Sequence, residues 1–334
     1  MKADLKRSLF EMLNKFLLVM AFIGIALTAL SVISGQALAA YPDRPIKIYV
    51  MAAPGGATDI VARLVAENMS KTLKQQIIVE NQPGGGGTVA LSAVAHAKPD
   101  GYSLLITTSV IVAAPALYSK LPYDTEKSFA PISQLVTFLN MFVTHPGFPA
   151  KQLSEFIPYA KANEVKLASG GVGGNTWVLT MKLNKTAGTK IRYLPYKGIG
   201  PALIDLVGGH VDAALGDVAA LKQLLAAGKI LPIAVTSPKR APGFPNVPTL
   251  AEAVPGFDHQ GWIGCLAPAG TPKDVIQILS KAVVAALTDP VVRGRLQNDD
   301  FGIVGSTPDE FSDFFKKELA DHATVIKATG VKLE

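Results

Sequence analysis

Residues 46–65, IKIYVMAAPGGATDIVARLV, contain the clearest signals of fold class in this chain. Residues 46–52 form a short run rich in β-branched and apolar side chains, which predicts a strand. The breaker Pro54-Gly55-Gly56 ends that strand. Apolar side chains then recur at helical spacing over residues 60–73. The stretch therefore predicts a strand, a glycine-rich loop and a helix.

The same order of strand, breaker and helix recurs along the rest of the chain. Further strands are predicted at residues 76–79, 102–107, 165–168, 211–215 and 230–236. Further helices are predicted at residues 88–97 and 218–227, around Trp177, from Pro201 to the Gly208-Gly209 stop, after Pro272, and after the capping box at residues 307–310. Alternating strands and helices imply an α/β fold with mostly parallel sheets that helices cover on both faces.

The composition excludes several classes of protein. The 334 residues carry a formal net charge of +6, with 49% hydrophobic and 17% charged residues. Such a chain is not disordered, and its length allows a large buried core. Its single cysteine, Cys265, excludes an intramolecular disulfide framework and a multi-cysteine zinc site. The mild positive charge is not evidence for nucleic-acid binding, which calls for clustered Lys and Arg side chains with stacking aromatics.

The first 39 residues have the order of a secretory signal peptide. Basic side chains between Lys2 and Lys15 precede an apolar, uncharged run at residues 16–33. Ala37-Leu38-Ala39 then supplies small residues at the spacing that a signal peptidase reads, which predicts cleavage before Ala40. A transmembrane anchor is the alternative, because the apolar run approaches the ~18 residues that can span a bilayer.

The common catalytic and metal-binding motifs are missing from the sequence. There is no His-Glu-x-x-His, Gly-x-Ser-x-Gly, Walker A, or Gly-x-Gly-x-x-Gly after a strand. The five histidines show no metal-ligand spacing and are expected on the surface or in turns: His96, His145, His210, His259 and His322. Cys265 lies in an apolar strand without a basic neighbour, which predicts a buried, inert thiol. We therefore expect no catalytic residue, no metal and no cofactor.

Three glycine-rich loops each join the end of a predicted strand to the start of a helix. They lie at residues 53–59, 81–87 and 169–175. Ligands of open α/β sheets bind at this edge, and free backbone N–H groups at a helix N-terminus favour an anion. The three loops together predict a ligand site, although each could be a structural turn. Asp59 could face that site or could stabilise the first helical turn.

A longer series of motifs runs through the chain in a specific order. The motifs are YPDRPI at 41–46, APGGATD at 53–59, VENQPGGGG at 79–87, PDGY at 99–102, LPYD at 121–124, YKG at 196–198, PALIDL at 201–206, GGHVD at 208–212, PTLAE at 248–252 and APAGTP at 267–272. The series covers nearly all of the chain after residue 40. It resembles the periplasmic substrate-binding receptors of tripartite tricarboxylate transporters, often called Bug receptors.

The resemblance implies a two-lobed Venus-flytrap receptor with a mostly parallel sheet in each lobe. After the signal peptide at residues 1–39, the first lobe would be discontinuous, at residues 40–142 and 263–334, and the second would span 143–262. The lobes would close on a small organic carboxylate and deliver it to integral-membrane permease subunits. The resemblance implies a monomeric periplasmic protein that is not an enzyme and binds no nucleic acid.

The resemblance also assigns ligand-binding residues by position. The first-lobe clamp would consist of Pro54, Gly55, Gly56, Asp59, Gly84, Gly85, Gly86 and Gly87, with Thr108 and Ser109 after the next strand. The second lobe would contribute Ser169, Gly171, Gly173, Asn175, Thr176, Trp177 and Asp217. Asp217 could instead be the N-terminal residue of a helix, and Lys197 is expected in a solvated turn.

Three departures from the family pattern bear on the ligand. Ala52 stands where an aromatic residue is common, residues 110–112 (VIV) stand where polar residues are common, and Trp177 stands where His is common. All three favour an apolar pocket, and hence an aromatic or bulky apolar carboxylate over a citrate-like acid. Trp177 could instead be a core aromatic on the inner face of its helix.

Two other functions are compatible with the sequence. A receptor of this kind could present its ligand to a membrane signalling partner without transport. A secreted α/β hydrolase could use Ser109 or Cys265 as nucleophile, which requires a base within hydrogen-bond reach.

Overall fold

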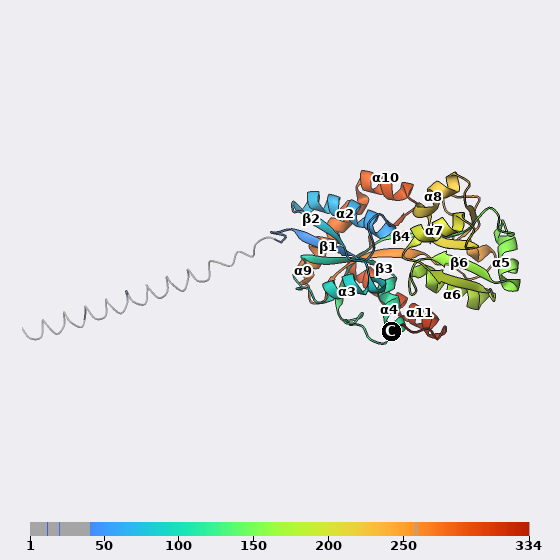
Figure 1. Cartoon of the computed structure of the whole chain (residues 1–334). Coiled ribbons are helices and arrows are strands. Elements are labelled where there is room, and N and C mark those ends of the chain that lie inside the picture. The colour runs from blue at the N-terminus through green and yellow to red at the C-terminus, as the bar shows by residue number, and fades with distance from the viewer. Residues whose placement is uncertain (1–11, 13–19, 21–40, 258, 334) are drawn as a thin grey trace, which may run out of the picture. The chain divides into compact units, whose positions relative to one another are not determined.

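The computed structural model describes residues 12, 20, 41–257 and 259–333 (Figure 1). The described residues from Arg44 onward form one compact unit. The predicted signal peptide at residues 1–39 lies outside the described residues, except for Met12 and Met20.

The strands of the compact unit form two sheets. The six-stranded sheet has the order β11-β4-β10-β3-β1-β2. Its strands are β1 (Ile46–Val50), β2 (Ile77–Asn81), β3 (Ser103–Thr108), β4 (Phe129–Phe138), β10 (Gly261–Pro268) and β11 (Gly302–Ile303). The five-stranded sheet has the order β7-β6-β8-β5-β9. Its strands are β5 (Asn140–Thr144), β6 (Val165–Ser169), β7 (Ile191–Pro195), β8 (Ala213–Asp217) and β9 (Leu231–Val235).

Helices cover both faces of the six-stranded sheet. They are α2 (Ala57–Leu73), α3 (Thr88–Ala95), α4 (Val110–Leu117), α9 (Lys273–Thr288), α10 (Pro290–Asn298) and α11 (Pro308–Lys327). The step from β1 to β2 runs opposite to the step from β2 to β3, so right-handed connections place α2 and α3 on opposite faces (Figure 1). Helices α3, α4 and α11 share a core with Leu105, Trp262 and Leu266.

The five-stranded sheet is covered in the same way. Its helices are α5 (Leu153–Ala162), α6 (Asn175–Ala187), α7 (Ile199–Val207) and α8 (Val218–Ala226). Helices α5 and α6 pack on the face that carries Phe142. Helices α7 and α8 pack on the face that carries Met141 and Val143. This alternation of neighbouring side chains along β5 is the period of two that a strand buried on both faces requires.

The predicted α/β fold with two sheets is confirmed, and both sheets are mixed. Strand β1 pairs parallel with β2 and β3, and β6 pairs parallel with β7 and β8. The antiparallel pairs all involve the strands that begin or end a passage between the sheets, or β11 at an edge. The chain passes from β4 to β5 at Leu139 and returns between Val235 and Gly261. The exact lobe boundaries at 142/143 and 262/263 stay a prediction.

Within the described residues, no single helix is both long and apolar enough to cross a membrane, and only the bent pair α9 and α10, at 66° to each other, reaches those limits jointly.

Candidate functional site

The first two glycine-rich loops lie next to each other at one edge of the six-stranded sheet. Strand β1 leads into residues 53–56 and α2, and the adjacent parallel strand β2 leads into Gly84–Gly87 and α3. Strand β3, parallel to β1, ends at Thr108 and leads through Ser109 into α4. Because the carboxyl ends of parallel strands meet at one edge, the predicted first-lobe residues are brought together by the topology.

Hydrogen bonds to the Asp59 carboxylate link the first loop to the end of β2. Its buried carboxylate accepts hydrogen bonds from the Gly55 N–H (3.0 Å), from Nε of Arg63 (3.0 Å) and from Nδ2 of Asn81 (2.9 Å). Burial alone would raise the pKa of Asp59, but these hydrogen bonds hold it below its usual value. The geometry supports the structural role left open for Asp59, and its ligand contact stays a prediction.

The backbone of the second loop requires glycine. Gly84, Gly85, Gly86 and Gly87 all have positive φ. A Cβ on Gly86 would lie 2.5 Å from the Tyr118 hydroxyl oxygen, and one on Gly85 would lie 2.3 Å from Oγ1 of Thr88. Any side chain at these positions therefore strains the loop.

Ser109 contributes a buried hydroxyl at the same edge. It precedes α4 and is 1% exposed, and its Oγ has no hydrogen-bond partner among the described residues. No base contacts it there, so the geometry gives no support to Ser109 as a nucleophile. Cys265 is buried, which raises the pKa of its thiol to about 12 and leaves it an inert core residue.

The second-lobe loop is held by a chain of neutral hydroxyl groups. Oγ of Ser169 lies 2.9 Å from Oγ1 of Thr176, which lies 2.9 Å from the Tyr193 hydroxyl. That hydroxyl donates to the carbonyl oxygen of Gly170 (2.8 Å). Burial raises the pKa of Tyr193, so the phenol stays protonated. The sequence did not point to Tyr193, because β7 brings it to the loop from the neighbouring strand.

Gly171 and Gly173 lie in the same loop, which meets α4 of the other sheet. A Cβ on Gly173 would lie 2.4 Å from Cδ1 of Leu117, whereas one on Gly171 would meet nothing within 4 Å. The close approach at Gly173 brings the second-lobe loop against a helix that starts among the first-lobe residues.

Trp177 occupies an apolar cluster. It is 4% exposed and packs with Ala113 and Leu117 of α4, with Val178, and with Ile326 of α11. This is the core position that the sequence left open as the alternative. Contact between Trp177 and a ligand stays a prediction.

Asp217 caps helix α8. Its carboxylate accepts a hydrogen bond from the Ala220 N–H at 2.9 Å, which is the N-terminal role that the sequence left open. Burial raises the pKa of Asp217 above its usual value. Lys197, the other uncertain residue of this lobe, is exposed as expected.

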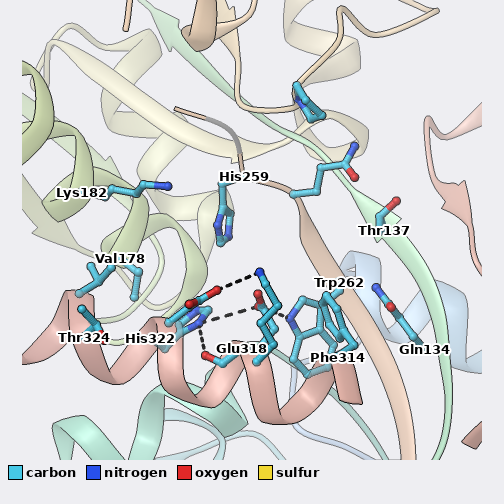
Figure 2. A pocket seen from close by; sticks show the side chains of 15 residues that line it. Gln134, Thr137, Val178, Lys182, His259, Trp262, Phe314, Glu318, His322 and Thr324 are labelled. Carbon is cyan, nitrogen blue, oxygen red and sulfur yellow. Dashed lines mark hydrogen bonds and ion pairs between the residues drawn. The ribbon is translucent and has the colours of Figure 1, made fainter. Parts of the chain in front are cut away.

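A separate pocket of about 540 Å³ lies between α6, α11 and the strands β4 and β10 (Figure 2). Trp262 donates from Nε1 to the Glu318 carboxylate at 2.8 Å, and Nδ1 of His322 donates to the Glu318 carbonyl oxygen at 2.9 Å. The rings of His259 and His322 lie edge to face, with centroids 6.2 Å apart and 62° between their planes (Figure 2). Of the predicted ligand-binding residues, none lines this pocket in the described part of the chain. Nor do any three described His, Cys, Asp or Glu side chains form a group that could hold a metal ion.

Comparison with known proteins places this geometry in a family. Residues 61–331 match the profile of the tripartite tricarboxylate transporter family receptor. The chain belongs to that family. The family resemblance drawn from the sequence motifs is thereby confirmed.

Solved structures similar to this receptor share its fold over nearly their whole length. The periplasmic binding protein BugD is 35% identical, with a TM-score of 0.80, and the match covers 88% of this chain and 100% of BugD. Rpa4515 of R. palustris, solved with adipate, is 31% identical with a TM-score of 0.81, over 87% of this chain and 99% of its own. MatC from Rhodopseudomonas palustris, with bound malate, is 34% identical with a TM-score of 0.78, and the match covers 86% of this chain and 100% of MatC. The family and these neighbours are solute-binding receptors, not enzymes, as predicted.

Replacing Gly56 with Val tests the first loop without disturbing the fold. Gly56 precedes α2 with an extended φ of −82°, and an added Cβ would meet only the Ala53 carbonyl oxygen, at 4.0 Å. If a ligand anion approaches this backbone, the valine side chain obstructs it, and affinity is expected to fall at least tenfold. Calorimetric titration with an acid that binds the unmodified receptor measures this change. Gly294→Val on α10, where a Cβ meets nothing within 4 Å, is the matched control. Equal affinity in all three proteins would remove loop 53–56 from the site.

Proposed function

We propose that this receptor captures a small carboxylate between its two lobes and delivers it to the permease of a tripartite transporter. The observation that carries the proposal is the convergence of loops 53–56 and Gly84–Gly87 at one sheet edge, where α2 and α3 begin. N–H groups at helix N-termini attract an anion. The internal neutralisation of Asp59 by Arg63 lowers the repulsion that this carboxylate would otherwise exert on the anion.

The proposed ligand is a carboxylate with an apolar body. Ile111 and Val112 are buried in the core, so only Ala52 and Val110 of the apolar substitutions in the first lobe are partly exposed. They favour a ligand with few hydroxyl groups. The burial of Trp177 weakens the case for aromatic stacking, and adipate and malate in the similar structures widen the choice to aliphatic diacids. Aliphatic and aromatic acids are therefore both included, and compared, in the ligand screen described below.

The proposed setting is the periplasm. Members of the family are periplasmic binding proteins, and residues 1–39 have the sequence of a signal peptide. We propose that the mature protein begins at Ala40 and works as a monomer whose lobes close about the crossings at Leu139 and between Val235 and Gly261.

A thermal-shift screen tests the proposed ligand class. The panel contains adipate, malate, citrate and benzoate. The control for each acid is the methyl ester in which every carboxyl group is esterified, so that no anionic group remains. An acid present at 100 times its Kd is expected to stabilise the fold by ~2.7 kcal/mol, and its ester by much less. Binding of citrate alone would contradict the apolar pocket. Equal stabilisation by acid and ester would contradict anion recognition.

A further inference from the structure

Four residues form a closed ring of hydrogen bonds where the chain passes between the two sheets. Asn140 begins β5 directly after the first crossing, Thr236 follows β9, and His259 precedes β10 on the return. Asn175 is the first residue of α6, in the second-lobe ligand loop. The ring joins both crossings to that loop, although its members lie far apart in the sequence.

The bonds of the ring can be followed one by one. The Asn140 N–H donates to Oγ1 of Thr236 (3.1 Å), and the Thr236 N–H donates to the Asn140 carbonyl oxygen (2.9 Å). The His259 N–H donates to the Thr236 carbonyl oxygen (2.9 Å). Nδ2 of Asn175 donates to Oδ1 of Asn140 (2.6 Å), and Nε2 of His259 bonds to Oδ1 of Asn175.

The ring fixes the role of the His259 side chain. The Asn175 amide donates to Asn140, so its own oxygen must accept, and Nε2 of His259 must carry the donated proton. Asn140, Thr236 and Asn175 are 2%, 0% and 8% exposed. Water therefore does not readily replace a missing partner, and a buried amide oxygen left without its donor is costly.

We propose that His259 is a positioning residue for ligand binding, which holds Asn175 and with it the first turn of α6 in register with both crossings. This inference rests on the proposed function, because the ligand loop it positions is the predicted one. The Asn175 side chain serves the ring, so the contribution of this residue to the ligand comes from the backbone at the start of α6. Movement at the first crossing reaches the ligand loop through the Asn140 side chain, and movement at the return crossing reaches it through the His259 imidazole.

Two substitutions of His259 separate the effect of its hydrogen bond from the effect of its size. His259→Leu removes the donor, and His259→Gln keeps an N–H donor on a side chain of similar reach. His259 borders the 540 Å³ pocket, which leaves space around the substituted side chain. His210→Leu, at an exposed histidine of a turn, is the matched control.

The first readout needs no ligand. Amide hydrogen exchange over residues 174–179 is expected to be at least tenfold faster in His259→Leu than in the unmodified receptor, while the strands of both sheets keep their protection. His259→Gln should restore most of the protection, and His210→Leu should not change it. Unchanged exchange at 174–179, or uniform acceleration across the whole chain, would overturn the inference.

The second readout uses adipate and malate as probes. Their Kd is expected to rise at least tenfold in His259→Leu and to return within about threefold of the unmodified value in His259→Gln. In Asn175→Ala the ring is already broken, so adding His259→Leu should weaken binding little further. An unchanged Kd in His259→Leu would overturn the inference. Failure of both acids to bind the unmodified receptor would count against the proposed ligand class, and the exchange experiment would still decide on the ring.

Discussion

Replacing Trp177 with Ala is expected to lower the free energy of unfolding by about 3–5 kcal/mol, the usual cost of removing a large aromatic side chain from a core. Trp177 is 4% exposed and packs against α4 and α11 from the first residues of α6. Its contacts therefore join the five-stranded side of the molecule to helices of the six-stranded side. Urea unfolding followed by circular dichroism measures the loss, since the midpoint shifts while the slope is retained.

The alternative role of Trp177 makes a different prediction. A tryptophan that stacks on an aromatic ligand contributes ~0.5–1.5 kcal/mol to binding and is exposed in the free protein. Its removal would then weaken benzoate binding by less than about tenfold and change stability little. Val291→Ala is the control, because Val291 is 79% exposed and its truncation should stay within ~0.5 kcal/mol. Trp177→Phe should recover part of the stability if packing is the cause.

Local pattern was sufficient to predict the strand, glycine-rich loop and helix at the start of the six-stranded sheet. The strand predicted at 46–52 is Ile46–Val50, and the loop and helix follow it as expected. The capping box at Thr307 is confirmed, with Glu310 bonding back to the Thr307 N–H. These features depend on neighbours within a few residues, so the sequence contains all of their partners.

Other elements were decided by tertiary packing. Residues 110–117 carry β-branched side chains and Pro115, which do not favour a helix, yet they form α4. Burial of Ile111 and Val112 in the core outweighs that weak local preference. The sequence also did not predict the antiparallel direction of β9 and β10, because that direction follows from where the chain crosses between the sheets.

The sequence predicted which types of residue gather at the candidate site better than it predicted the role of each side chain. Glycine-rich loops at strand ends could be identified, because glycine at these positions has a local conformational reason. The hydrogen bond between Asn175 and Asn140 spans 35 residues, and that between His259 and Asn175 spans 84. No spacing rule connects such pairs, so His259 was expected on the surface or in a turn and Asn140 was not considered.

The stability of the receptor is expected to fall as the pH drops below about 6.5, and His259 is the main single cause. Burial lowers the pKa of His259 to about 3, helped by the nearby His322 and Lys182. Burial also lowers the pKa of His322, against the opposing effect of the Glu318 carboxylate. The His259 imidazole is therefore neutral in the fold, while in the unfolded chain it takes up a proton below its ordinary pKa. Acid therefore favours unfolding, by about 1.4 kcal/mol per pH unit for each fully shifted group.

Urea unfolding at pH 7.5 and pH 4.5 measures this loss. His259 alone is expected to lower the free energy of unfolding by about 2–3 kcal/mol between pH 7.5 and pH 4.5. This contribution should disappear in His259→Gln, whatever the stability of that variant at neutral pH. His210→Gln, at an exposed histidine, is the control variant. If His259→Gln loses as much stability in acid as the unmodified receptor, His259 is not held neutral by the fold. The direction of the hydrogen-bond ring would still stand, because the Asn175 oxygen requires only a proton on Nε2, and the neutral imidazole and the imidazolium both supply one. That result would therefore contradict the buried, neutral state of His259, and the exchange experiment would still decide on the ring.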